Sequence, residues 1–132
     1  MKKLIALLAL ALTGALLVAG CSSSSNAVTT VDPQTFLQTA SQPGVTVLDV
    51  RTPEEYAAGH LDGAVNINVE APDFDAQIGA LDKTAAYAVY CHSGRRSALA
   101  TDAMAKAGFT TVTNLQGGIA DLQAAGGQIV TS

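Results

Sequence analysis

The fold of this chain is decided by the stretch Ala88-Val89-Tyr90-Cys91-His92-Ser93-Gly94-Arg95-Arg96-Ser97, where an apolar run stops at a cysteine and a helix follows. Residues 85–90 are apolar and lack helical caps, which is typical of a strand buried on both faces. After the turn, small apolar residues recur at helical spacing, and Gly108 lies where a C-terminal cap is expected. Cys91 is therefore predicted at the carboxyl end of a strand, where open α/β sheets place their ligand sites.

The residues after Cys91 are predicted to surround its sulfur with positive charge. Turn amides, the start of the following helix, Arg95 and Arg96 all favour a bound anion. A thiol with an ordinary pKa of about 8.5 is only slightly ionised at neutral pH, and such surroundings lower that pKa. We therefore interpret Cys91 as a nucleophile rather than an inert core thiol. The substrate-binding loop is expected to consist of His92, Ser93, Gly94, Arg95, Arg96 and Ser97.

Three blocks of the sequence resemble the single-domain rhodaneses, a family of sulfurtransferases that carry a persulfide on cysteine. The blocks are the spacing Cys-x-x-Gly-x-Arg-Ser at 91–97, LDVRTPEEY with GHLDGAVNI over 48–67, and NLQGGI at 114–119. The resemblance implies a rhodanese-like α/β domain over residues 28–132. Its expected architecture has three layers, a central and mostly parallel sheet with helices on both faces, as alternating strands and helices also indicate.

The same resemblance implies a thiosulfate sulfurtransferase. The Cys91 thiolate would take the sulfane sulfur of thiosulfate, or of another donor, and pass it to cyanide, a thiol or a protein acceptor. The two loop arginines favour thiosulfate as the small-molecule donor. No cofactor is expected, and no metal, because no ligand spacing joins His60 and His92 to Cys91.

Two alternatives stay open. A phosphatase or arsenate reductase of the same fold would resemble a Cys-x5-Arg loop, but the sixth residue after Cys91 is Ser97, and a shorter loop leaves less room for a tetrahedral oxyanion. A sulfur carrier or sensor with little turnover, working with a membrane partner, would need the same cysteine. Leu122 stands where many relatives have a tryptophan after the glycine pair Gly117-Gly118, which keeps the second alternative open.

Three polar residues are candidates for a supporting role. Asp49 and Arg51 lie at the end of a neighbouring strand and could reach the loop, but a structural ion pair that holds this strand to a helix is the preferred interpretation. His60 is expected to fix a turn with a hydrogen bond. His92 either assists proton transfer or has no special role.

The N-terminus has the pattern of an exported protein. Lys2 and Lys3 precede an apolar run, and Val18-Ala19-Gly20-Cys21 resembles the lipobox of bacterial lipoproteins. We expect a signal peptide at 1–20, a lipidated Cys21 and a polar tether over 21–27, with an uncleaved membrane helix as the alternative. The domain would then be lipid-anchored to the cell envelope membrane, on its periplasmic or extracytoplasmic face, with Cys91 as its one free thiol.

The charge of the chain argues against nucleic acid as a partner. The formal net charge is −4, and without residues 1–20 five basic residues face eleven acidic ones, which gives −6. An acidic domain is repelled by phosphate backbones.

The remaining elements alternate between strand and helix. Further strands are expected at 28–31, 45–50, 64–69 and 112–115. Helices are expected to begin after the caps Asp32 and Thr52 and to lie around 74–81 and 118–125.

Overall fold

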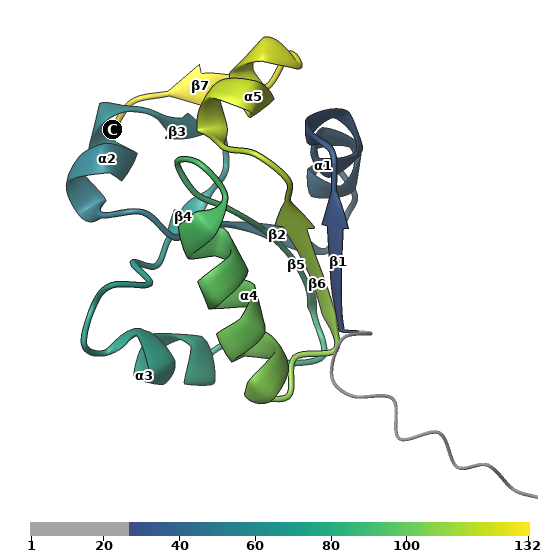
Figure 1. Cartoon of the computed structure of the whole chain (residues 1–132), viewed down its shortest axis with the longest axis vertical. Helices are drawn as coiled ribbons and strands as arrows, with labels where there is room; N and C mark the ends of the chain where they lie inside the picture. The colour runs from purple at the N-terminus through teal and green to yellow at the C-terminus, as the bar shows by residue number, and fades with distance from the viewer. Residues whose placement is uncertain (1–26) are drawn as a thin grey trace, which may run out of the picture.

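The structure is a computed structural model, and it describes residues 27–132 (Figure 1). The predicted signal peptide at 1–20, the lipidation site Cys21 and nearly all of the tether lie outside the described residues. Within the described part of the chain, no helix combines the length and the apolar character that crossing a bilayer requires.

A parallel sheet of five strands forms the centre of the domain. Its strands are β1 (Val28–Val31), β2 (Val45–Asp49), β4 (Val65–Asn66), β5 (Ala86–Tyr90) and β6 (Thr111–Leu115). They lie in the order β1-β6-β5-β2-β4, and every neighbouring pair is parallel. The strand that leads to Cys91 is therefore central, with β2 on one side and β6 on the other.

Helices cover both faces of the sheet, as Figure 1 shows, so the predicted three-layer architecture is confirmed. The helices are α1 (Pro33–Ala40), α2 (Pro53–Ala58), α3 (Phe74–Gly79), α4 (Arg95–Lys106) and α5 (Ile119–Ala124). Buried residues of α1 and α5 pack against one face, and those of α3 and α4 pack against the other. The short helix α2 follows β2 and lies beside the carboxyl ends of the strands.

The side chains of β5 alternate between the two halves of the core. Tyr87, Val89 and Cys91 belong to the cluster under α3 and α4, whereas Ala88 and Tyr90 belong to the cluster under α1 and α5. This alternation is the period of two that an extended strand imposes. It places the Cys91 side chain on the face that α4 covers.

The predicted helix caps are present. The side chain of Asp32 accepts a hydrogen bond from the Thr35 amide at 2.8 Å, and proline occupies the first turn of α1. Thr52 and Glu55 form a capping box at the start of α2. Such boxes satisfy amides that the helix itself leaves without partners.

One predicted strand is shorter than expected. The sequence predicts a strand over 64–69, but the structure has only the two residues of β4. Two further hydrogen bonds continue the pairing, from the Ile67 amide to the carbonyl of Asp49 and from the Val69 amide to the carbonyl of Val50. Because β2 ends at Asp49, the segment after β4 has no strand left to pair with. The other predicted elements agree with the structure to within two residues.

A second, small sheet was not expected from the sequence. It pairs β3 (His60–Leu61) with β7 (Ile129–Val130) in antiparallel orientation. Two-residue strands are too short to show any hydrophobic period, so no sequence pattern marks them. This pairing joins the last strand of the domain to the segment that follows α2.

Candidate active site

Cys91 lies directly after β5, at the carboxyl edge of the sheet, as the sequence predicts. The residue is fully buried. The Gly94 amide donates a hydrogen bond to Sγ at 3.0 Å, and the carbonyl of Cys91 accepts one from the Ile119 amide at 3.0 Å. The cysteine is therefore held by its own loop and by the first residue of α5.

The surroundings of Cys91 lower the pKa of its thiol. Burial is the largest single influence and by itself would raise this pKa. It is outweighed by hydrogen bonds from the Ser97 hydroxyl and from the amides of Ser97, Gly94 and Ser93, which stabilise the thiolate. The Ser97 hydroxyl also lies 3.1 Å from the carbonyl oxygen of Gly94, and rotation of its O–H lets it donate to either group. The loop amides and this hydroxyl thus favour the thiolate form of Cys91.

The loop rests against the glycine pair at the start of α5. Gly94 has a φ of +104°, in the region that favours glycine, and a Cβ there would lie 3.2 Å from the Gly117 carbonyl oxygen. A Cβ on Gly118 would lie 1.7 Å from the carbonyl oxygen of His92. The loop and the glycine pair therefore meet through their backbones, and there is no room for a side chain at Gly118.

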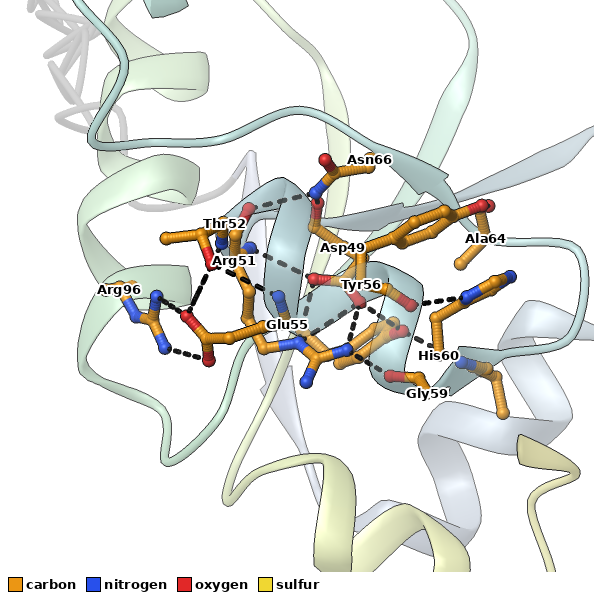
Figure 2. Close-up of polar contacts among 12 residues, drawn as sticks. Asp49, Arg51, Thr52, Glu55, Tyr56, Gly59, His60, Ala64, Asn66 and Arg96 are labelled. Carbon is orange, nitrogen blue, oxygen red and sulfur yellow. Dashed lines mark hydrogen bonds and ion pairs between the residues drawn. The ribbon is translucent and has the colours of Figure 1, made fainter. Parts of the chain in front are cut away.

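The two loop arginines have different surroundings. The guanidinium of Arg96 forms a two-pronged ion pair with Glu55, at 2.7 Å and 2.8 Å, as Figure 2 shows. It also reaches Glu70 at 3.2 Å. Hydrogen bonding to Arg96 is the main reason that the pKa of Glu55 falls to about 2. Arg95 is exposed and forms no ion pair within residues 27–132.

The supporting residues form a separate network beside the loop. Figure 2 shows Arg51 bonded to the fully buried Asp49, at 2.6 Å, and to the carbonyl oxygen of Gly59, also at 2.6 Å. The Tyr90 hydroxyl donates to Asp49 at 2.7 Å and accepts from the Leu61 amide at 2.9 Å. The ion pair joins two neighbouring residues at the end of β2, and the hydrogen bond from Arg51 to the Gly59 carbonyl ties this strand end to the end of α2.

His60 is placed by helix α2. Its Nδ1 lies 2.8 Å from the carbonyl oxygen of Tyr56, and its ring stacks on the Tyr56 ring at a centroid distance of 3.7 Å (Figure 2). The hydrogen bond expected to fix this turn is present. His92, by contrast, is exposed and lines a pocket of about 280 Å³ that lies between α2, α5 and β7.

Sequence reasoning missed the acidic partners of the loop. Glu55 has the pattern of a capping-box residue and nothing in the sequence joins it to Arg96, 41 positions later. Tyr90 has the pattern of a core residue, and only its position before Cys91 drew attention to it. Among residues 27–132, no group of three or more histidine, cysteine, aspartate or glutamate side chains is placed to hold a metal ion.

Comparison with known proteins identifies the family. The sequence model described as "Rhodanese-like domain" matches residues 32–125, and the chain belongs to this family. The crystal structure of the Alr3790 protein from Anabaena sp. is similar, with a TM-score of 0.68 and 29% identity over 77% of this chain and 82% of that one. The parallel sheet flanked by helices thus has a counterpart of known structure.

Two curated relatives carry more specific names. Thiosulfate sulfurtransferase PspE of Escherichia coli (strain K12) is 36% identical over 75 residues, which are 57% of this chain and 71% of the relative. Putative sulfur carrier protein YrkF of Bacillus subtilis (strain 168) is 32% identical over 101 residues, which are 76% of this chain and 54% of the relative. The chain therefore spans about half of the second relative.

Proposed function

We propose that this protein is a sulfurtransferase that carries a sulfane sulfur as a persulfide on Cys91. The observation that carries the proposal is the lowered pKa of this cysteine. Cys91 directly follows a central strand, and the hydrogen-bond donors of its loop surround its sulfur. A thiolate is the reactive form in nucleophilic attack on sulfur. Similarity to a relative named thiosulfate sulfurtransferase supports the same chemistry.

The proposed reaction has two half-reactions. The Cys91 thiolate attacks the outer sulfur of thiosulfate, the S–S bond of the donor breaks, and sulfite leaves with the bonding electrons. The acceptor, cyanide for example, then attacks the outer sulfur of the Cys91 persulfide, and thiocyanate leaves while the thiolate is restored. The loop amides stabilise the negative charge on sulfur in both steps. Such a sequence gives ping-pong kinetics.

Intact mass spectrometry of the purified protein tests this proposal. We expect thiosulfate or an organic persulfide to add the mass of one sulfur atom, and cyanide to remove it. The Cys91→Ser variant should gain nothing and should unfold at a similar urea concentration. A wild-type protein that gains no sulfur from either donor, or a Cys91→Ser variant that gains it equally, would contradict the proposal.

A sulfur carrier with little turnover is the second candidate function. The full burial of Cys91 favours it, as does similarity to a relative named putative sulfur carrier protein. The two functions differ in turnover. A transferase releases many thiocyanate molecules per protein molecule, whereas a carrier releases about one and then waits for a partner. Steady-state thiocyanate formation with excess thiosulfate and cyanide separates them.

We further propose that the protein is exported and anchored to the cell envelope membrane through a lipid on Cys21. The support is the pattern of residues 1–21. A tether of about six residues reaches roughly 20 Å when extended, which keeps the domain near the lipid surface. In membrane fractionation, we expect the wild type in the membrane fraction and Cys21→Ser to lack the mass of the lipid. A wild-type protein without lipid on Cys21 would overturn this proposal.

A further inference from the structure

The charges around the cysteine loop are nearly balanced. Arg95 and Arg96 carry positive charge, but Arg96 is bonded to two carboxylates. The Arg96 side chain is 17% exposed and that of Glu55 is 33% exposed, so solvent screens this pair only in part. Arg95 is thus the loop cation that no carboxylate of residues 27–132 neutralises.

Glu55 is held in place from two sides. Its Oε1 accepts a hydrogen bond from the Thr52 hydroxyl at 3.2 Å, and both its oxygens bind Arg96 (Figure 2). The capping box fixes the carboxylate at the first turn of α2, and Arg96 belongs to the first turn of α4. The ion pair therefore joins two helices, and any rotation of the Arg96 guanidinium away from Glu55 breaks both hydrogen bonds.

We propose that Glu55 sets donor specificity by neutralising Arg96, which lowers the advantage of doubly charged thiosulfate over singly charged organic persulfides. This inference rests on the proposed function of Cys91. The interaction of an anion with a fixed charge scales with the charge of the anion. Withdrawal of one positive charge therefore weakens binding of a dianion by twice the free energy that it removes from a monoanion. Specificity is a difference of affinities, so the persulfide gains relative to thiosulfate.

The reaction with a persulfide donor balances in the same way as that with thiosulfate. The Cys91 thiolate attacks the outer sulfur of R–S–S⁻, the donor S–S bond breaks, and R–S⁻ leaves in place of sulfite. One persulfide and one thiolate are present before and after the step, and no oxidant is required.

The Glu55→Gln variant tests the role of this charge. Glutamine removes the charge but is also a preferred partner in the capping box, so α2 should form normally. At low ionic strength we expect the KM for thiosulfate to fall about tenfold and that for an alkyl persulfide about threefold, since the monoanion takes half the free energy. Both changes should shrink in 0.5 M salt, where charges are screened. Equal changes for the two donors, or no change for either, would overturn the proposal.

Glu54→Gln is the matched control. Glu54 lies in the same helical turn, is exposed, and forms no ion pair among the described residues. Its replacement makes the same change in net charge, and we expect less than about a twofold change in KM. An effect as large as that of Glu55→Gln would show that bulk charge, and not Arg96, determines donor choice.

A double-mutant cycle shows whether Glu55 acts through Arg96. In an Arg96→Gln background, Glu55→Gln should no longer improve thiosulfate use, because no cation remains to be released. A full effect in that background would overturn the assigned route. Thiosulfate binding to Cys91→Ser, measured by calorimetry with and without Glu55→Gln, keeps the test independent of turnover. A chain that forms no persulfide at all contradicts the proposed function, whereas unchanged thiosulfate affinity in this pair contradicts only the role of Glu55.

Discussion

Cys91 experiences two opposing influences at the scale of a single residue. Burial disfavours its thiolate, and the hydrogen bonds of its loop favour it. The bonds are local, since Gly94 and Ser97 lie within six positions of the cysteine. The hydrogen bonds that lower the pKa of this thiol therefore all come from its own loop. His92 follows Cys91 directly and is exposed.

Replacement of Ser97 by alanine should raise the pKa of Cys91. The variant removes a hydroxyl that donates to the thiolate but keeps the backbone amide of residue 97. The thiol therefore becomes harder to ionise. We expect the pH profile of alkylation by iodoacetamide to move to higher pH and the rate at pH 7 to fall. Thr101→Ala is a control, since Thr101 is buried on the same helix as Ser97 and its hydroxyl donates to the carbonyl of Ala98. Profiles that coincide for Ser97→Ala and the wild type would contradict this account.

The sequence predicts the place of Cys91 but not the state of its arginines. An apolar run and a glycine suffice to locate the turn, because both signals are local. The partner of Arg96 is not local, and Glu55 meets it only after α2 and α4 have packed beside the sheet. The sequence predicts positive charge from both loop arginines but gives no sign that Arg96 is paired with Glu55 and Glu70.

At the scale of elements, the cysteine loop and the start of α5 fit together as two backbones. The Ile119 amide bonds to the carbonyl of Cys91, and Gly118 touches the carbonyl of His92. Side chains contribute nothing to this contact, so it depends on the absence of a Cβ. The position of the loop is thus set by an element that follows it by more than twenty residues.

The Gly118→Ala variant should lose both stability and activity. Its Cβ would collide with the His92 carbonyl, and we expect the free energy of unfolding in urea to fall by about 2–3 kcal/mol. Gly79→Ala is the matched control, because a Cβ there meets nothing within 4 Å and alanine favours the helix. The control should be neutral or stabilising by up to about 1 kcal/mol. Equal stability of the two variants would show that the loop moves aside at no cost.

Helices and strands are predicted correctly where several neighbouring residues in the sequence mark them. The caps of α1 and α2 and the buried run of β5 are each marked by several neighbouring residues, and all are where the sequence predicts them. The strands β3 and β7 have no such signal, because each consists of two residues and forms only by pairing with residues 68 and 70 positions away. Pairing of this kind is a property of the folded chain.

At the scale of the whole molecule, the β3–β7 pair joins the C-terminal segment to the region around α2. Ile129 is half-buried, packs against the α1 and α5 half of the core, and lines the pocket beside His92. The amide of Asp62 also bonds to the Gln128 carbonyl at 2.8 Å. The last strand therefore ties helix α5 and the supporting network into one unit.

Removal of residues 129–132 should weaken the whole domain without unfolding it. We expect the free energy of unfolding to fall by about 1–2 kcal/mol, because two half-buried aliphatic side chains are lost. Removal of 131–132 alone takes only exposed residues and should change it by less than about 0.5 kcal/mol. Urea titration measures both, and a 129–132 deletion as stable as the wild type would show that β7 is dispensable.

The burial of Cys91 also has a consequence for oxidative damage. A thiolate is the form that peroxide converts to sulfenic and then sulfinic acid, and the last of these steps is not readily reversed. Because Cys91 is fully buried, we expect an oxidant and a sulfur donor to need the same rearrangement around Sγ before either can reach it. Peroxide and the sulfur donor then compete for the same accessible thiolate. An abundant donor therefore protects the cysteine, because it reacts before peroxide does.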